Sequence, residues 1–210
     1  MRVTVRTLGV ASAVALLAGC SILKSNVPQQ QVFVLRPVAP VAVATTAPAG
    51  LQLPKPNVDP ALDHERIALV RPGNRVDYYA GARWGGSLSD VLDSLFAQRF
   101  RASGAFPMVD TDRGGFGAQY VIAITVRRFE AEYGADPNAA PTAQVVLECT
   151  VGNRNNRTTV ASFDVATSAP AADNRLGEVV AALDRAANDA VTQVIERTAG
   201  VVAGAGSAAR

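Results

Sequence analysis

The sequence predicts an α+β domain, in which a mainly antiparallel sheet carries two helices on one face to form a two-layer sandwich. Alternating apolar and polar residues between 120 and 165 are typical of strands with one buried face. Two other segments, 88–103 and 175–198, have apolar residues at helical spacing. The expected order is two strands, a helix, four strands and a second helix.

The early part of the chain predicts short strands separated by a proline-rich segment. A first strand is expected over 31–35 and a second over 66–70, ended by the turn signal Pro72-Gly73-Asn74. The prolines of 37–60 remove backbone donors, so this segment should be extended and weakly structured, with a short edge strand at Leu51 and Leu53.

The helices have recognisable ends. Ser87 with Asp90 resembles a capping box for the helix over 88–103, and Gly104 is a terminator. The second helix, over 175–198, is apolar on one broad face and should pack on a sheet or a partner. The remainder, 200–210, is rich in glycine and alanine and is expected to be flexible.

The later strands are expected at 107–109, 120–132, 143–151 and 158–165. The strand over 143–151 should pair antiparallel with 120–132, and Asn153-Arg154-Asn155-Asn156-Arg157 should form a hairpin connection to the last strand.

The first twenty residues have the layout of a secretory signal, with Arg2 and Arg6 ahead of an uncharged apolar segment over 8–17. That segment is too short to span a membrane, which takes about 20 apolar residues. Leu17-Ala18-Gly19-Cys20 is similar to the lipobox of bacterial lipoprotein precursors. We therefore expect removal of 1–19, lipidation of Cys20 with diacylglycerol and palmitate-type chains, and a tether over 20–31. The alternative is an ordinary signal whose cleavage site adjoins a cysteine.

The residue after the cysteine bears on localisation. Ser21 is not the aspartate that retains many enteric lipoproteins in the inner membrane. We therefore expect an anchor in the outer membrane of the bacterial envelope, with the domain facing the periplasm. One acyl chain holds only marginally, whereas the two or three chains of bacterial lipoproteins make detachment negligible.

Charge excludes one class of partner. The 20 Lys and Arg residues include Arg2 and Arg6, so the chain after the signal carries 18 basic and 18 acidic residues. A neutral chain has no field with which to attract nucleic acid. The lysines, Lys24 and Lys55, both lie near the N-terminus, so a polybasic membrane patch is absent as well.

Catalysis has no support in the sequence, and we expect neither an enzyme nor a cofactor beyond the acyl anchor. The single histidine, His64, is expected to be an exposed loop residue, and no G-x-S-x-G motif is present. No metal-ligand spacing occurs either. Glu130 and Glu132 lie beside two arginines on a strand, where a solvated face is the expected setting.

Cys149 has no intrachain partner once Cys20 is acylated. It alternates with Val145, Leu147 and Val151 on the apolar face of a strand, which predicts a buried and inert thiol. The alternatives are a reactive thiol and a disulfide between chains.

One segment, 66–84, gathers two of the four tyrosines and the single tryptophan beside several arginines. Tyrosine, tryptophan and arginine are the usual hot-spot residues of interfaces. The candidate docking residues are Asp77, Tyr78, Tyr79, Arg83 and Trp84. The alternative is that Trp84 and a tyrosine cover the core under the first helix.

The same segment carries a family resemblance. The chain resembles the ABC-type transport auxiliary lipoprotein family, which includes the lipoprotein subunit of paraquat-inducible, MCE-type transport systems. The matching residues are Cys20 in its lipobox, 32–37, 67–72, 77–79, 82–84 and 100–106. Phe33 departs from the pattern, because family members commonly have tyrosine there.

The resemblance implies a non-catalytic docking or scaffolding lipoprotein of a lipid transport system. Its implied partners are an MCE substrate-binding subunit, the permease and ATPase, and the membrane through the anchor, with lipid and a homo-oligomer left open. The auxiliary domain would cover 32–199. An alternative function is a structural outer-membrane assembly lipoprotein attached to a β-barrel.

Overall fold

The computed structural model describes residues 30–39, 43–111 and 117–208. The predicted signal peptide over 1–19, Cys20, nearly all of the tether and the glycine-rich loop over 112–116 lie outside the described residues. The elements are β1 (Gln31–Phe33), β2 (Leu51–Gln52), β3 (Asn57–Val58), β4 (Arg66–Arg71), β5 (Arg75–Trp84), α2 (Leu88–Ala102), β6 (Val109–Asp110), β7 (Tyr120–Glu132), β8 (Thr142–Asn153), β9 (Thr158–Pro170) and α3 (Leu176–Ala208).

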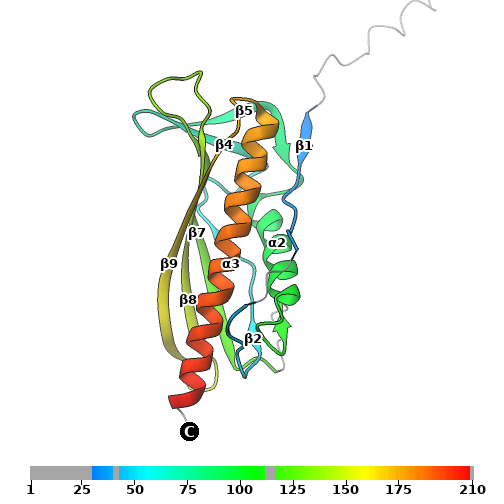
Figure 1. Cartoon of the computed structure of the whole chain (residues 1–210), viewed down its shortest axis with the longest axis vertical. Coiled ribbons are helices and arrows are strands. Elements are labelled where there is room, and N and C mark those ends of the chain that lie inside the picture. The colour runs from blue at the N-terminus through cyan, green and yellow to red at the C-terminus, as the bar shows by residue number, and fades with distance from the viewer. Residues whose placement is uncertain (1–29, 40–42, 112–116, 209–210) are drawn as a thin grey trace, which may run out of the picture.

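The two-layer α+β architecture is confirmed. The strands form one sheet, and α2 and α3 lie on the same side of it, with α3 running along the length of the domain (Figure 1). β1 lies toward one end of the long axis, and the C-terminus lies at the other end. The long ladders, β7 with β8 and β8 with β9, are antiparallel, as is the β4–β5 hairpin.

The strand β7 organises the sheet because it is long enough to take several partners. One of its edges pairs with β8 over nearly its whole length. The other edge pairs in parallel with three short strands in succession: β2 at Tyr120, β3 at Thr125 and β4 at Ala131. The proline-rich segment therefore contributes β2 and β3 to the sheet. Ala47, Ala49, Leu51 and Leu53 along it are buried, so the expectation of weak structure is corrected there.

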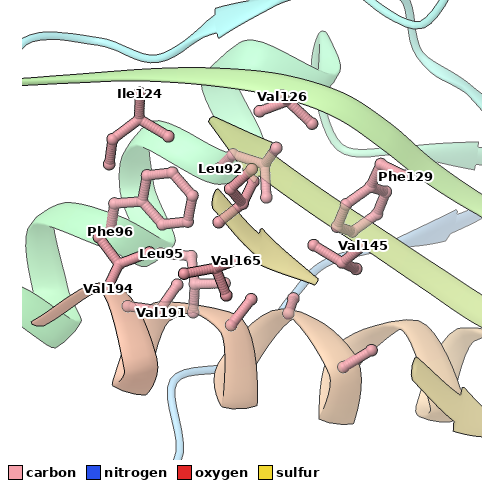
Figure 2. Close-up of a cluster of buried hydrophobic side chains, with 14 of the residues drawn as sticks. Leu92, Leu95, Phe96, Ile124, Val126, Phe129, Val145, Val165, Val191 and Val194 are labelled. Atoms are coloured by element: carbon pink, nitrogen blue, oxygen red, sulfur yellow. The ribbon is translucent and has the colours of Figure 1, made fainter. Parts of the chain in front are cut away.

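The core lies between the helices and the sheet. Figure 2 shows apolar side chains of α2 and α3 meeting those of β7, β8 and β9. The alternation that predicted these strands is visible in the burial: Ile122, Ile124 and Val126 are at most 2 % exposed, whereas Ala123 between them is exposed. The helix α2 begins as predicted, since the Asp90 N–H donates to Ser87 Oγ at 3.3 Å.

The structure corrects the end of the second helix. α3 continues to Ala208, so the predicted end at Thr198 is wrong, and so is the flexible segment over 200–208. Glycine lowers helix propensity by about 1 kcal/mol relative to alanine. Here Ala199 and Val202 are fully buried in the core. Burial of one face therefore outweighs the local preference of Gly200, Gly204 and Gly206.

The structure also contains a strand that the sequence pattern does not predict. β5 runs from Arg75 to Trp84, between the predicted turn and α2, and pairs with both β4 and β1. β8 and β9 extend beyond their predicted ends, to Asn153 and Pro170, because they stay paired along their full length.

Candidate functional site

The hairpin of β4 and β5 carries all of the predicted docking residues. Its turn has positive φ at Gly73 (82°) and Asn74 (58°), the conformation that fits the right-handed twist of a tight hairpin. Ala68 of β4 pairs with Tyr78 of β5. Two residues earlier in β4, Arg66 pairs with Arg83, so the register between the two strands shifts there. β5 therefore bulges over 79–82, where Gly81 has φ of 69°.

The first contact group is centred on Tyr78, which is half-buried. The Arg66 guanidinium lies over the Tyr78 ring, with its carbon 3.7 Å from the ring centroid. His64 approaches the same ring edge-on at 4.7 Å, and its Nδ1 accepts the Arg66 N–H at 3.2 Å. The Tyr78 hydroxyl donates to the carbonyl of Ala61 at 3.3 Å. The Tyr78 ring thus has an arginine over its face and a histidine in edge contact, and the three side chains form one continuous group.

The second contact group is an ion pair beside that surface. Arg83 Nη1 donates to Glu65 Oε2 at 2.9 Å, and both side chains are substantially exposed. Because Arg83 lies opposite Arg66, the ion pair is next to the Tyr78 stack. We call His64, Glu65, Arg66, Tyr78 and Arg83 the β4–β5 cluster.

Trp84 belongs to the core instead. Its side chain is 1 % exposed and packs edge-on against Phe129 of β7, with centroids 5.9 Å apart. The core alternative stated for this residue is therefore the correct one, and Trp84 offers no docking surface in this structure.

Tyr79 also faces inward. Its hydroxyl lies 2.8 Å from that of Tyr133, which donates to Asn174 Oδ1 at 2.7 Å. Burial, followed by the bond to Tyr133, raises the pKa of Tyr79 far above its ordinary value. These hydroxyls join β5 to the residues that follow β7 and precede α3.

Asp77 lies near the hairpin turn and apart from the cluster. It is exposed, accepts the Tyr78 N–H at 2.8 Å and approaches Arg71 Nε at 3.9 Å. Of the five predicted docking residues, Tyr78 and Arg83 come together at the surface, Asp77 is exposed beside them, and Tyr79 and Trp84 point into the domain.

Sequence reasoning missed three members of the cluster. His64 was expected to be an exposed loop residue, but its ring is half-buried against Tyr78, and its Nε2 is buried without a partner among the described residues. Arg66 lies in the segment 66–84 but was not among the five candidates, and Glu65 lies just outside that segment. Regular pairing from the turn would have placed Arg66 opposite Ala80, and only the bulge in β5 brings Arg66 opposite Arg83.

The other titratable residues that the sequence singles out form ion pairs or are buried in the core. Arg128 binds Glu130 at 2.6 Å and Glu132 at 3.3 Å, and Glu130 is buried, unlike the predicted solvated face. Cys149 is a free, buried thiol, as predicted, and burial raises its pKa to about 12. In the part of the chain that the structure covers, no three His, Cys, Asp or Glu residues are grouped as a metal site requires.

Across the described ranges, no helix is both long and apolar enough to cross a membrane.

Comparison with known proteins defines the family. The model of the ABC-type transport auxiliary lipoprotein component matches residues 33–195. No curated protein matches the chain. Among solved structures, protein XCC0632 of Xanthomonas campestris has 23 % identity and a TM-score of 0.74, with 86 % of this chain and all of that chain covered.

Two further structures share the fold. An uncharacterized protein has 10 % identity and a TM-score of 0.62, covering 80 % of this chain and 98 % of its own. The hypothetical protein CT253 of Chlamydia trachomatis has 10 % identity and a TM-score of 0.51, covering 74 % and 98 %. The family model spans most of the domain described above, from β1 into α3. This chain belongs to the family of ABC-type transport auxiliary lipoprotein components.

Proposed function

We propose that this auxiliary lipoprotein is a non-catalytic docking component of an MCE-type lipid transport system, anchored through acyl chains on Cys20 in the outer membrane and facing the periplasm. The family membership supports an envelope lipoprotein associated with an ABC-type transporter. Ser21 after the lipidated cysteine supports the outer membrane.

The observation that carries the docking role is the β4–β5 cluster. It exposes an arginine ion pair beside a stacked tyrosine and arginine, which is the composition of an interface hot spot. Exposed ion pairs contribute at most about 1 kcal/mol to stability. Arg83 is therefore expected to contribute more free energy to partner binding than to the stability of the fold.

The docking experiment measures binding of purified Arg83→Ala to the MCE subunit. A hot-spot arginine contributes at least about 2 kcal/mol, roughly a 30-fold loss of affinity. We expect such a loss with an unchanged melting temperature. Arg127→Ala is the matched control, because Arg127 also forms a solvent-exposed ion pair, with Glu148 on the sheet surface, and its side chain is 54 % exposed against 35 % for Arg83. We expect it to bind normally.

Undiminished binding of a normally folded Arg83→Ala would remove the cluster from the interface. Early melting of that variant would make Arg83 an internal brace. Co-purification with a β-barrel protein in place of the MCE subunit would favour an outer-membrane assembly role.

The anchoring experiment is separate. Cys20→Ala should abolish palmitate labelling and give an unprocessed or soluble periplasmic product. The proposal of a Cys20 anchor fails if this variant still labels and still fractionates with the outer membrane.

A further inference from the structure

The nine residues Gln31–Ala39 run from β1 alongside both helices, and we call them the strap. The strap is the first described part of the chain after the segment that leads from Cys20. Any pull on a lipid anchor at Cys20 would therefore reach the domain through it.

Two side chains of α3 bind the main chain of the strap. Asn188 donates from Nδ2 to the Arg36 carbonyl at 2.9 Å and accepts the Val38 N–H on Oδ1 at 3.1 Å. Asp184 Oδ1 accepts the Arg36 N–H at 2.9 Å. These bonds join residues about 150 positions apart in the sequence.

One side chain of α2, Arg99, binds the strap as well, and we call Asp184, Asn188 and Arg99 the seat. Arg99 Nη1 donates to the carbonyls of Val38 at 2.8 Å and Ala39 at 3.1 Å, while Nη2 donates to Thr192 Oγ1 at 2.6 Å. Every strap atom in these bonds is a backbone atom. The seat therefore binds an extended main chain through hydrogen bonds that do not depend on the side chains of the strap.

The seat is polar, and two of its side chains are buried. Arg99 is 4 % exposed and Asn188 is 2 % exposed. Within the described residues Arg99 donates only to neutral oxygens and its Nε has no partner, and burial lowers its pKa. Burial of a charge without a carboxylate costs free energy. If the strap left, water would hydrate this guanidinium and replace the lost bonds.

The strap itself is poorly packed. Val32, Val34 and Val38 are 52 %, 54 % and 50 % exposed, whereas Leu35 is buried and Phe33 is half-buried against the core. A cavity of about 220 Å³ lies between Val34 and Val91 of α2, and another of about 660 Å³ lies beside Val38 and Arg101. Apolar burial therefore comes from Phe33 and Leu35 and holds the strap less than it holds the core strands, while β1 adds backbone pairing with β5.

We propose that the strap is a releasable segment that sets how far the domain reaches from its anchor. The strap is held mainly by hydrogen bonds, those of β1 to β5 and those over a hydratable seat, and such a segment opens at lower free energy than one held by apolar burial. Release of nine residues lengthens the tether by up to about 30 Å. Strap opening stands on the structure alone, whereas its effect on reach rests on the proposed anchor at Cys20.

The first test is hydrogen exchange of the mature, acylated chain in detergent. The Arg36 and Val38 amides, which donate to Asp184 and Asn188, should exchange at least about 100-fold faster than Ile124 in the centre of β7, once corrected for intrinsic rates. Equal protection of the three amides would mean that the strap leaves only on global unfolding, and would overturn the proposal.

Asn188→Leu tests the seat, because it removes two strap bonds while keeping the branching and the number of heavy atoms of the side chain. The strap amides should exchange at least about tenfold faster than in the wild type, with Ile124 unchanged. Thr198→Val is the matched control: Thr198 is a buried polar residue of the same helix, and its hydroxyl has no partner among the described residues. It should leave strap exchange unchanged. A null effect of Asn188→Leu, or an equal effect of Thr198→Val, would refute the seat.

Reach is measured as the distance between spin labels at Gln31→Cys and Glu196→Cys, since buried Cys149 resists labelling. Adding Asn188→Leu should convert a narrow distance distribution into a broader one that extends to longer distances. One narrow distribution in both proteins would refute the change in reach. Palmitate labelling of the same preparations reports the anchor separately, so failure at Cys20 and failure of the strap are distinguishable.

Discussion

The β7–β8–β9 ladder and the β4–β5 hairpin are both antiparallel, but different interactions hold them. The ladder pairs residue after residue, with one shift in each of its two pairings, and buries a continuous apolar face under the helices. The hairpin is interrupted by a bulge of several residues and exposes half of the residues of β5. The regular region supplies stability, and the irregular region supplies exposed polar and aromatic groups that a partner can bind.

Trp84 is where the two regions meet, so its truncation should have the largest effect. It is the last residue of β5, and it packs on Phe129 of β7. Trp84→Ala should lower the free energy of unfolding by about 3–5 kcal/mol. Urea denaturation followed by circular dichroism measures this loss. A loss below about 1 kcal/mol would show that β5 is independent of the ladder.

Cys149 tests the interior of the ladder. It is fully buried between Leu147 and Val151. Cys149→Ala should cost about 1–2 kcal/mol, a small value for a small side chain. Function should survive. Rapid labelling of the native thiol, or a dimer sensitive to reductant, would contradict a packing role.

The same variant isolates a pH effect. Burial raises the Cys149 pKa from 9.0 to about 12, so the folded chain holds the thiol proton where the unfolded chain releases it. The thiol's contribution is complete below pH 9 and is lost as the pH rises toward 12. The stability advantage of the wild type over Cys149→Ala should therefore shrink between pH 8 and 11. A constant difference in urea midpoint would contradict this.

The hydroxyl pair of Tyr79 and Tyr133 tests how β5 is fastened beyond the bulge. Tyr133→Phe removes the hydrogen bonds of the Tyr133 hydroxyl to the Tyr79 hydroxyl and to Asn174. It should lower the free energy of unfolding by about 1–2 kcal/mol. Tyr79→Phe should cost less, because Tyr133 keeps Asn174. The double variant should lose less than the sum of the two single losses. Additive losses in a thermal denaturation cycle would show that the hydroxyls act independently.

The surface ion pairs should have the smallest effects on stability in both regions. Arg83→Ala in the hairpin and Arg127→Ala on the ladder should each change the free energy of unfolding by less than about 0.5 kcal/mol. Differential scanning calorimetry gives both values. An effect of Arg83→Ala alone on partner binding would support a binding role for the hairpin and not for the ladder. Equal binding by the two variants would contradict that difference between the regions.

The predictability of each region follows from its regularity. β7 was predicted at its observed bounds because Ile122, Ile124 and Val126 alternate with less buried residues. β5 was missed because the bulge around Gly81 breaks the alternation: exposed residues continue to Asp77, and two half-buried tyrosines follow in succession. The candidate site was found by composition at Tyr78 and Arg83. Its partners His64, Glu65 and Arg66 needed the pairing of β4 with β5.

The α+β class, the ladder, the start of α2 and the burial of Cys149 follow from the amino-acid pattern alone. Each of these depends on a local period or a cap, which neighbouring residues specify through backbone geometry. The end of α3, the inward direction of Trp84 and the seat of the strap depend instead on contacts between distant parts of the chain. Arg99 and Asn188 bind a main chain that lies far away in sequence. Backbone atoms are the same in every residue. The side-chain pattern of the sequence therefore does not predict which segment the seat will bind.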